Sequence, residues 1–329
     1  MAESAPLTTC PPWLLEHWRD VFHRHEKASL PHALLFTGMP GLGKKQFARF
    51  VAESLLCTQS SADTGACGEC ESCAQLIAGS NPELMALNPE GAAMSIKVDS
   101  VRELVGWLQL SAPQGRYRVA LIDSSDAMNR HAANSLLKTL EEPGERAVLL
   151  LAASRPGALP ATVRSRCQTT LLTVRDHKSA VDWLVEQGLD DVDTQLTHAQ
   201  VGPLGIVEHN SPEWLVSEQL LKQAWRDLFL MRASVGKIVD TLSDLSIARC
   251  LNNFSNWALL ANKKLFNVPI GVDPATAELI SDVHGGLDSE QWFTLHDRIH
   301  RLYRSDSASF KTQTVLEGLF ADIRLMTQD

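Results

Sequence analysis

The sequence predicts an α/β protein whose mostly parallel sheet is covered by helices on both faces and followed by an all-helical C-terminal part. Two observations predict this fold class. Between about residues 30 and 172, apolar runs of strand length alternate with segments of helical periodicity, which is typical of a parallel sheet. From about residue 212 onward, apolar residues recur at helical spacing and no strand pattern is found.

Short apolar runs mark the expected strands. The first, HALLFTG at 32–38, enters a glycine-rich turn, and three more follow along the chain, at 117–123, 147–153 and 169–174. Runs of this length that are apolar throughout favour strands buried on both faces. We therefore expect these segments to lie side by side in one sheet.

Helices are expected between these runs. Residues 44–56 place apolar side chains on one helical face. The Ser100–Glu103 stretch has capping-box spacing, which predicts a helix that begins near Ser100. A third helix is expected from about 129 to 142, where Pro143-Gly144 ends it.

The character of the chain changes after Val174. Residues 176–188 have a helical pattern, and a polar stretch then leads to GPLG at 202–205. We expect three domains, at 1–174, 175–210 and 211–329.

Composition limits the function. The 329 residues carry a formal net charge of −9, which excludes a uniformly basic surface that coats DNA. A nucleic-acid role would have to be local or shared with partners. No apolar run approaches the roughly 20 residues that span a bilayer, and the N-terminus has no secretion-signal pattern, so a cytoplasmic protein is expected.

Residues 37–45, TGMPGLGKK, fit a phosphate loop except at the last position. Gly38, Gly41 and Gly43 allow backbone N–H groups to approach phosphate, and Lys44 supplies positive charge. Lys45 stands where a Ser or Thr hydroxyl would coordinate Mg²⁺, and an ammonium cannot do so. Metal-assisted hydrolysis is therefore not expected, while nucleotide binding and a ligand-free glycine turn both stay open.

A second catalytic element is incomplete. The apolar run at 117–123 ends in Asp123, as a Walker B strand does, where the Asp supports Mg²⁺. Ser124 follows where a Glu would activate water, and a hydroxyl is a poor general base at neutral pH. The other interpretation is a strand that ends in a solvated Asp.

Four of the seven cysteines lie close together in the sequence. Cys57, Cys67, Cys70 and Cys73 have the spacing C-x9-C-x2-C-x2-C in a stretch rich in small and turn-forming residues. Four thiolates complete a tetrahedral zinc shell and leave no open position, so the predicted zinc is structural. An iron–sulfur cluster and free thiols are the competing interpretations.

The stretch LPATVRSRC at 159–167 offers two arginines on a turn after a strand. Surface exposure of such a pair is common. Alternatively, a guanidinium that projects outward can stabilise a γ-phosphate held by a neighbouring chain.

Taken together, these stretches resemble the bacterial clamp-loader branch of the AAA+ proteins. The resemblance is carried by the four cysteines and by residues 31–44, 96–104, 133–143 (ANSLLKTLEEP) and 159–167. It implies a RecA-like parallel sheet with an inserted zinc module at about 57–75, a small helical lid domain at 175–210 and a helical collar at 211–329 that joins a hetero-pentamer. It also implies a structural zinc at the four cysteines.

Within this branch, motor subunits complete the phosphate loop with Ser or Thr and place Glu after the Walker B Asp. This chain departs at Lys45 and Ser124, and again at Gly205, where the family's sensor-2 helix carries an arginine. The departures match the subunit of the clamp loader that resembles a motor but does not hydrolyse ATP.

The resemblance gives Arg166, with Ser165 and Cys167 of its SRC motif, the role of an arginine finger in a neighbouring gamma/tau subunit's ATP site. Other implied partners are the delta subunit and, through the complex, the sliding clamp and primed DNA, within a DNA polymerase holoenzyme. An active gamma/tau-like ATPase with atypical residues is the main alternative, and a nucleotide-sensing AAA+ adaptor outside replication is a second.

Overall fold

A computed structural model of the chain describes residues 6–89, 95–110, 117–190, 192, 196, 201–270, 272–304 and 312–327. The chain divides into two compact units, Met1–Glu208 and His209–Asp329. The predicted small helical domain at 175–210 falls within the first unit except for residues 209–210, and its residues 191, 193–195 and 197–200 lie outside the described part. Its separation as a domain of its own stays a prediction.

A five-stranded parallel sheet forms the centre of the first unit. The strands pair in the order β2-β3-β4-β1-β5. They are β1 (Ala33–Thr37), β2 (Leu84–Leu87), β3 (Arg118–Ile122), β4 (Ala147–Ala153) and β5 (Gln168–Leu171). The predicted α/β class with a parallel sheet is confirmed, and β1, β3 and β4 lie within predicted runs. The run predicted at 169–174 as a buried strand is present as β5, but β5 ends at Leu171 and is mostly exposed, because it pairs on one side only, with β1.

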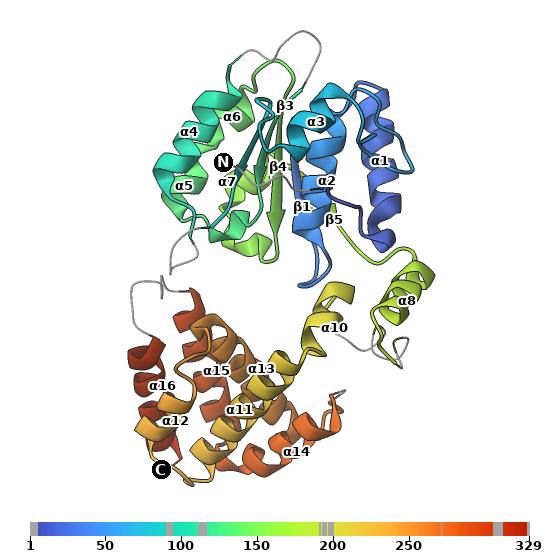
Figure 1. Ribbon diagram of the computed structural model, residues 1–329. Helices are drawn as coiled ribbons and strands as arrows, with labels where there is room; N and C mark the ends of the chain where they lie inside the picture. The colour runs from blue at the N-terminus through green and yellow to red at the C-terminus, as the bar shows by residue number, and fades with distance from the viewer. Residues whose placement is uncertain are drawn as a thin grey trace. The chain divides into compact units, whose positions relative to one another are not determined.

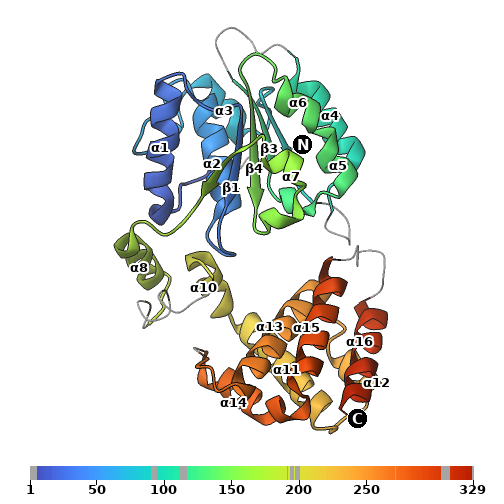
Figure 2. The same ribbon diagram turned by 180° about the vertical axis from the view of Figure 1, so that it is seen from behind.

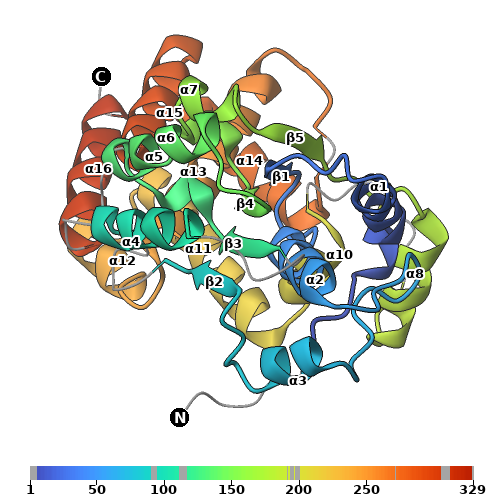
Figure 3. The same ribbon diagram turned by 90° about the horizontal axis from the view of Figure 1, so that it is seen from above.

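Helices cover both faces of this sheet (Figures 1 and 3). One face carries α1 (Leu15–Glu26), α2 (Lys44–Leu56) and α3 (Glu71–Ile77), and the other α4 (Val98–Leu108), α5 (Arg130–Ser135), α6 (Leu137–Glu141) and α7 (Ala161–Arg164). Alternate residues of each central strand enter the two cores; Leu34 and Phe36 pack with α2, whereas Leu35 packs with α4 to α7. This explains why β1, β3 and β4 are buried throughout.

The predicted start of α4 at Ser100 is wrong, because the helix begins at Val98. The N-cap is Lys97, and no side chain caps this end. Just before it, the Ile96 N–H donates to the Ala127 carbonyl at 3.3 Å and Ile96 bridges Met128. This pairing holds residue 96 extended, so the helix begins directly after Lys97.

The predicted helix at 129–142 is present as α5 and α6, with Leu136 between them. The Asn129 side chain caps α5 by accepting from the Ala132 N–H. The helix ends just before Pro143, as predicted.

The rest of the first unit is helical. Short η turns lie at Pro12–Leu14 (η1), Ser125–Ala127 (η2) and Pro156–Ala158 (η3), and α8 (His177–Glu186) and α10 (Pro203–His209) follow the sheet. Trp13 of η1 packs edge-on against Trp183 of α8, with ring centroids 5.0 Å apart. This contact fixes α8 to the N-terminal segment.

The second unit is built from helices alone within its described residues (Figure 2). They are α11 (Pro212–Phe229), α12 (Val235–Thr241), α13 (Ile247–Leu265), α14 (Pro274–Val283), η4 (His284–Gly286), α15 (Ser289–Arg304) and α16 (Thr312–Met326). Ser or Asp side chains cap α11 to α14 by accepting backbone N–H groups. Their apolar faces enclose one aromatic-rich core around Trp225, Phe254 and Trp292.

Candidate functional site

The phosphate loop joins β1 to α2 at the carboxyl edge of the sheet. Gly41 has φ +68° and Gly43 has φ +92°, a backbone conformation that glycine adopts without a steric penalty. Gly38 would place a Cβ only 2.7 Å from the Leu172 carbonyl oxygen. The loop therefore has the glycines that its shape requires.

Lys44 does not point into an open phosphate site. Only 6% of the residue is exposed, and its Nζ donates to the Met39 carbonyl of the same loop at 2.7 Å. Burial lowers the pKa of this ammonium to about 8; Asp126 opposes the shift and Lys45 adds to it. The charge that would meet a phosphate is bound by the loop itself.

The segment that begins α10 closes onto this loop. The Gly202 N–H donates to the Pro40 carbonyl at 2.8 Å, and the Leu204 and Gly205 N–H groups donate to the Gly41 carbonyl at 3.0 and 3.3 Å. We call these three hydrogen bonds the latch.

The two backbones of the latch are in such close contact that side chains do not fit. A Cβ on Gly41 would lie 2.5 Å from the Gly205 backbone, and one on Gly205 would lie 2.8 Å from the Val201 Cβ. Gly205 therefore serves a packing role at the position where the resembled family carries its sensor arginine.

The N-terminal segment also contacts the loop. Trp13 Nε1 donates to the Leu42 carbonyl at 2.9 Å. Upstream, the Thr8 N–H donates to the buried Glu53 carboxylate at 2.7 Å, and Arg49 Nε donates to the same carboxylate at 2.6 Å. Residues 8–13 thus lie across α2 and the loop that precedes it.

Asp123 lies at the same sheet edge, directly after β3. One of its carboxylate oxygens is buried without a hydrogen-bond partner. Burial raises its pKa, and Lys45 and Arg49 of α2 oppose this shift. Asp123 therefore faces cationic side chains on the helix that follows the phosphate loop.

Ser124, which directly follows Asp123, carries a hydroxyl where a catalytic carboxylate would stand. The nearest acid along the chain, Asp126, accepts the Arg155 N–H at 3.1 Å and lies 3.5 Å from Arg155 Nε. It is thus engaged with the turn after β4.

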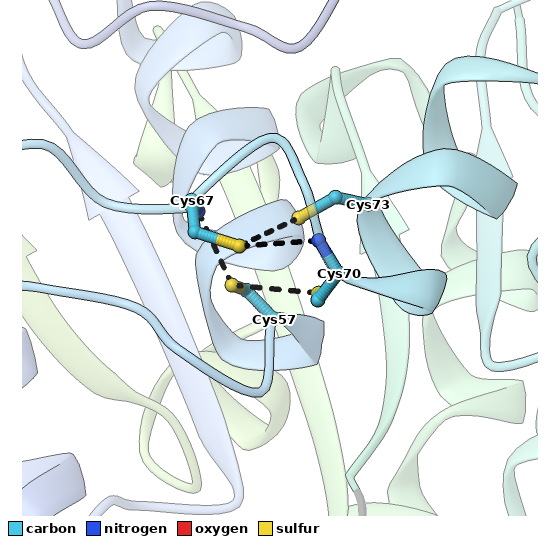
Figure 4. A group of neighbouring side chains, drawn as sticks. All are labelled: Cys57, Cys67, Cys70 and Cys73. Atoms are coloured by element: carbon cyan, nitrogen blue, oxygen red, sulfur yellow. Dashed lines mark hydrogen bonds between the residues drawn. The ribbon is translucent and has the colours of Figure 1, made fainter.

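The four cysteines form a second site, at the other end of α2. Cys57 follows the last residue of α2, Cys67 and Cys70 lie on the connecting loop, and Cys73 is in α3. Their sulfurs all lie within 4.8 Å of one another (Figure 4). The pairs Cys57–Cys70 and Cys67–Cys73 are each 3.9 Å apart.

This arrangement fits a tetrahedral metal. Zn–S bonds of about 2.3 Å imply sulfur–sulfur separations of about 3.8 Å, close to those present. Backbone N–H groups of Gln59 and Cys67 donate to the Cys57 sulfur at 3.3 and 3.2 Å, but burial outweighs them and raises the pKa of this thiol. Burial raises the pKa of Cys70, but hydrogen bonds from Thr58 outweigh it and lower the pKa to about 6.

Arg166 lies on the surface, two residues beyond α7. It is far from the phosphate loop in the sequence. The side chain is 37% exposed, and Ser165 beside it is exposed as well. Cys167 is buried with the core under α7, where burial raises its pKa to about 11. The SRC motif therefore points its arginine outward and anchors its cysteine inward.

The predicted loop residues, Asp123 and Gly205 belong to the chain segments around the phosphate loop, whereas the cysteines and Arg166 do not. Sequence reasoning missed Trp13, Glu53 and Gly202. The two glycines of GPLG at 202–205 are the signal that was available for the latch. None of the described helices combines the length and apolar character that crossing a bilayer requires.

Comparison with known proteins links this chain to DNA replication proteins. The model of a family described as "DNA polymerase III, delta subunit" matches residues 16–175. The DNA polymerase III subunit delta' of Pseudomonas aeruginosa is 41% identical over 173 residues, which cover 53% of this chain and 52% of that protein. The Escherichia coli delta' is 34% identical over 173 residues, with shares of 53% and 52%.

A tau subunit and a solved structure are also similar to this chain. The Escherichia coli subunit tau is 35% identical over 232 residues, or 70% of this chain and 31% of that protein. A gamma-subunit-related protein of Thermotoga maritima aligns over 95% of this chain and 99% of its own, with 17% identity and a TM-score of 0.42. The chain spans about half the length of the curated delta' relatives it matches.

Proposed function

The N-terminal half of this chain belongs to the family of DNA polymerase III delta-prime subunits, and from this premise we propose that the chain is a non-hydrolysing subunit of a clamp loader. This is the subunit type that the three departures at Lys45, Ser124 and Gly205 predict. It would help load the sliding clamp onto primed DNA as part of a polymerase holoenzyme.

The state of Lys44 carries the proposal. An ATPase needs this ammonium for phosphate, but here it is buried and bound to the Met39 carbonyl, and the latch fills the space beside the loop with backbone. Lys45 and Ser124 add no metal ligand or general base. Hydrolysis by this chain would require both the contacts and the residues to change.

We instead propose that this chain contributes to ATP hydrolysis through Arg166. Its exposed guanidinium, with Ser165 and Cys167, would enter the ATP site of a neighbouring gamma/tau subunit and stabilise the charge on the transferring phosphate. The chain would then contribute to catalysis in trans without turning over ATP itself.

An Arg166→Ala variant tests this assignment in a complex reconstituted with motor and delta subunits. Turnover at the neighbouring ATP site should fall by about 10³-fold, the effect typical of a lost arginine finger. Arg164→Ala removes an exposed arginine from α7 two residues away and should leave turnover unchanged. Equal turnover for the two variants would exclude the finger.

The alternative of an active gamma/tau-like ATPase has its own measurement. The purified chain alone should release no phosphate from ATP above background. Steady hydrolysis that Lys44→Ala abolishes would favour the alternative.

We further propose a structural zinc at Cys57, Cys67, Cys70 and Cys73. A closed shell of four thiolates provides no position for substrate, so the ion would hold the loop between α2 and α3. The loop is tied to α1 as well, since Trp18 Nε1 donates to the Ser61 carbonyl at 3.0 Å and Arg19 pairs with Asp63 at 2.9 Å. The zinc module would thereby stiffen one face of the sheet.

The remaining parts of the proposal concern assembly. Residues 175–210 would act as the lid domain and 211–329 as a collar that joins gamma/tau and delta subunits in a hetero-pentamer in the cytoplasm. Size and subunit composition of the reconstituted complex, measured with and without residues 211–329, test the collar.

A further inference from the structure

Two motif segments of unit Met1–Glu208 meet at one ion pair. Glu141, the last residue of α6, belongs to the stretch ANSLLKTLEEP, and Arg166 belongs to LPATVRSRC. One Glu141 carboxylate oxygen accepts Arg166 Nε at 2.9 Å and lies 2.7 Å from Arg166 Nη2. On the other side of the guanidinium, Nη1 donates to the Thr162 carbonyl at 3.0 Å.

These contacts hold the guanidinium and still leave donors at its tip. A guanidinium has five N–H groups. Glu141 and Thr162 take three of them, and Nη1 lies 3.5 Å from the Ser165 hydroxyl, which is at the limit of a hydrogen bond. Both terminal nitrogens therefore keep donor capacity for an anion that approaches from outside.

The stability of α6 does not explain why a glutamate occupies position 141. It occupies the last turn of α6, where the helix dipole disfavours negative charge, and Glu142 adds a second carboxylate beside it. The pair with Arg166 is also exposed at both ends, 37% and 54%, and such pairs contribute little to folding. The contact with Glu141 instead restricts the rotamers of Arg166. An arginine loses much rotamer freedom when it binds a ligand, and a side chain that is already ordered loses less.

We propose that Glu141 is a positioning residue that fixes the Arg166 guanidinium before a neighbouring chain presents its phosphate. This inference rests on the proposed function of Arg166. Glu141 itself touches no phosphate; it acts through the arginine alone.

The activity test compares Glu141→Gln with Glu142→Gln in the reconstituted complex. Both remove one exposed carboxylate from the same helix end. We expect Glu141→Gln to lower turnover at the neighbouring site by about threefold, in keeping with the modest energy of an exposed pair. The KM for ATP of the motor subunits and the turnover of Glu142→Gln should stay at the wild-type values.

A double-mutant cycle separates positioning from a general structural effect. Because Glu141 acts through Arg166, Glu141→Gln should have no further effect in an Arg166→Ala background. An equal loss in both backgrounds, or no loss in the wild-type background while Arg166→Ala is impaired, would overturn the inference and leave the proposed function intact.

A second readout needs no partner subunit. The side-chain Nε–H group of Arg166, identified by its absence from Arg166→Ala, should have a lower NMR order parameter in Glu141→Gln than in wild type or Glu142→Gln. An unchanged order parameter would refute positioning by Glu141. If Arg166→Ala has no effect on turnover, the proposed function fails, and this measurement still decides whether Glu141 orders the arginine.

Discussion

The two ends of helix α2 present two ligand sites of opposite character. At its N-terminus, the Lys44 ammonium of the phosphate loop is bound within the loop, where it donates to the Met39 carbonyl, and the latch engages the Pro40 and Gly41 carbonyls. At its C-terminus, four sulfurs surround one point at nearly the spacing that a metal imposes. One helix thus follows a loop whose lysine is bound within the loop and precedes a site whose four sulfurs converge.

The difference shows that a motif has to be judged by what its donor groups contact. Both motifs contain the residues for a ligand; the four cysteine sulfurs converge on one point, whereas the Lys44 ammonium binds a carbonyl of its own loop. The phosphate loop has kept its shape and uses it to bind another part of the same chain.

Loss of metal should produce the largest effect. Cys67→Ser and Cys73→Ser each remove one of four zinc ligands, and structural zinc is worth about 10 kcal/mol in small domains. We expect both variants to lose zinc and to unfold locally around α3. Metal content after denaturation and thermal unfolding with and without a chelator measure this.

Cys250→Ser, a buried thiol of the second unit, is the control for removal of a buried cysteine. It should keep about one zinc per chain. Zinc content equal to that of wild type in Cys67→Ser and Cys73→Ser would contradict the metal site.

The latch should give the next largest effect. Gly205→Arg restores the residue type of a sensor arginine but places a side chain against Val201 and the Gly41 backbone. Overpacking of this kind costs about 3 kcal/mol, which lowers Tm by roughly 6 to 12 °C in a unit of this size. Gly106→Arg on α4, where a Cβ meets nothing within 4 Å, should leave Tm nearly unchanged. A Gly205→Arg chain as stable as wild type would show that the latch is not tightly packed.

The buried ammonium gives a smaller, pH-dependent effect. The Lys44 pKa is about 8 in the folded chain, against an ordinary value of 10.5. Between these values the unfolded chain binds more protons than the folded chain, so stability rises as pH rises through this window. Relative to Lys44→Met, wild type should gain about 2 kcal/mol in unfolding free energy between about pH 7.5 and pH 9.5.

Urea unfolding at the two pH values measures this difference, with Lys138→Met, which removes an exposed lysine of α6, as control. A gap between wild type and Lys44→Met that does not change with pH would show that the ammonium is not held in a low-dielectric site.

Much of the fold could be predicted from the sequence because the central strands are apolar on both faces. Strand β2 was missed, since LMAL is short and only half-buried. The site could be predicted only in part. The latch joins Pro40 and Gly41 to Gly202, Leu204 and Gly205 through backbone atoms, so the sequence signals it only through the two glycines of GPLG. The Glu141–Arg166 pair joins the stretches ANSLLKTLEEP and LPATVRSRC. These are far apart in the sequence, so their contact is visible only in the tertiary structure.

The latch also changes which substitutions the phosphate loop can accumulate over evolutionary time. A nucleotide site needs the lysine for phosphate and the following Ser or Thr hydroxyl for Mg²⁺, in addition to the glycines. In this chain the restraint comes from backbone packed on backbone, which acts on Gly41, Gly202 and Gly205. Residue 45, where a phosphate loop has Ser or Thr, is not restrained by this packing. An exposed lysine can therefore replace the hydroxyl residue there.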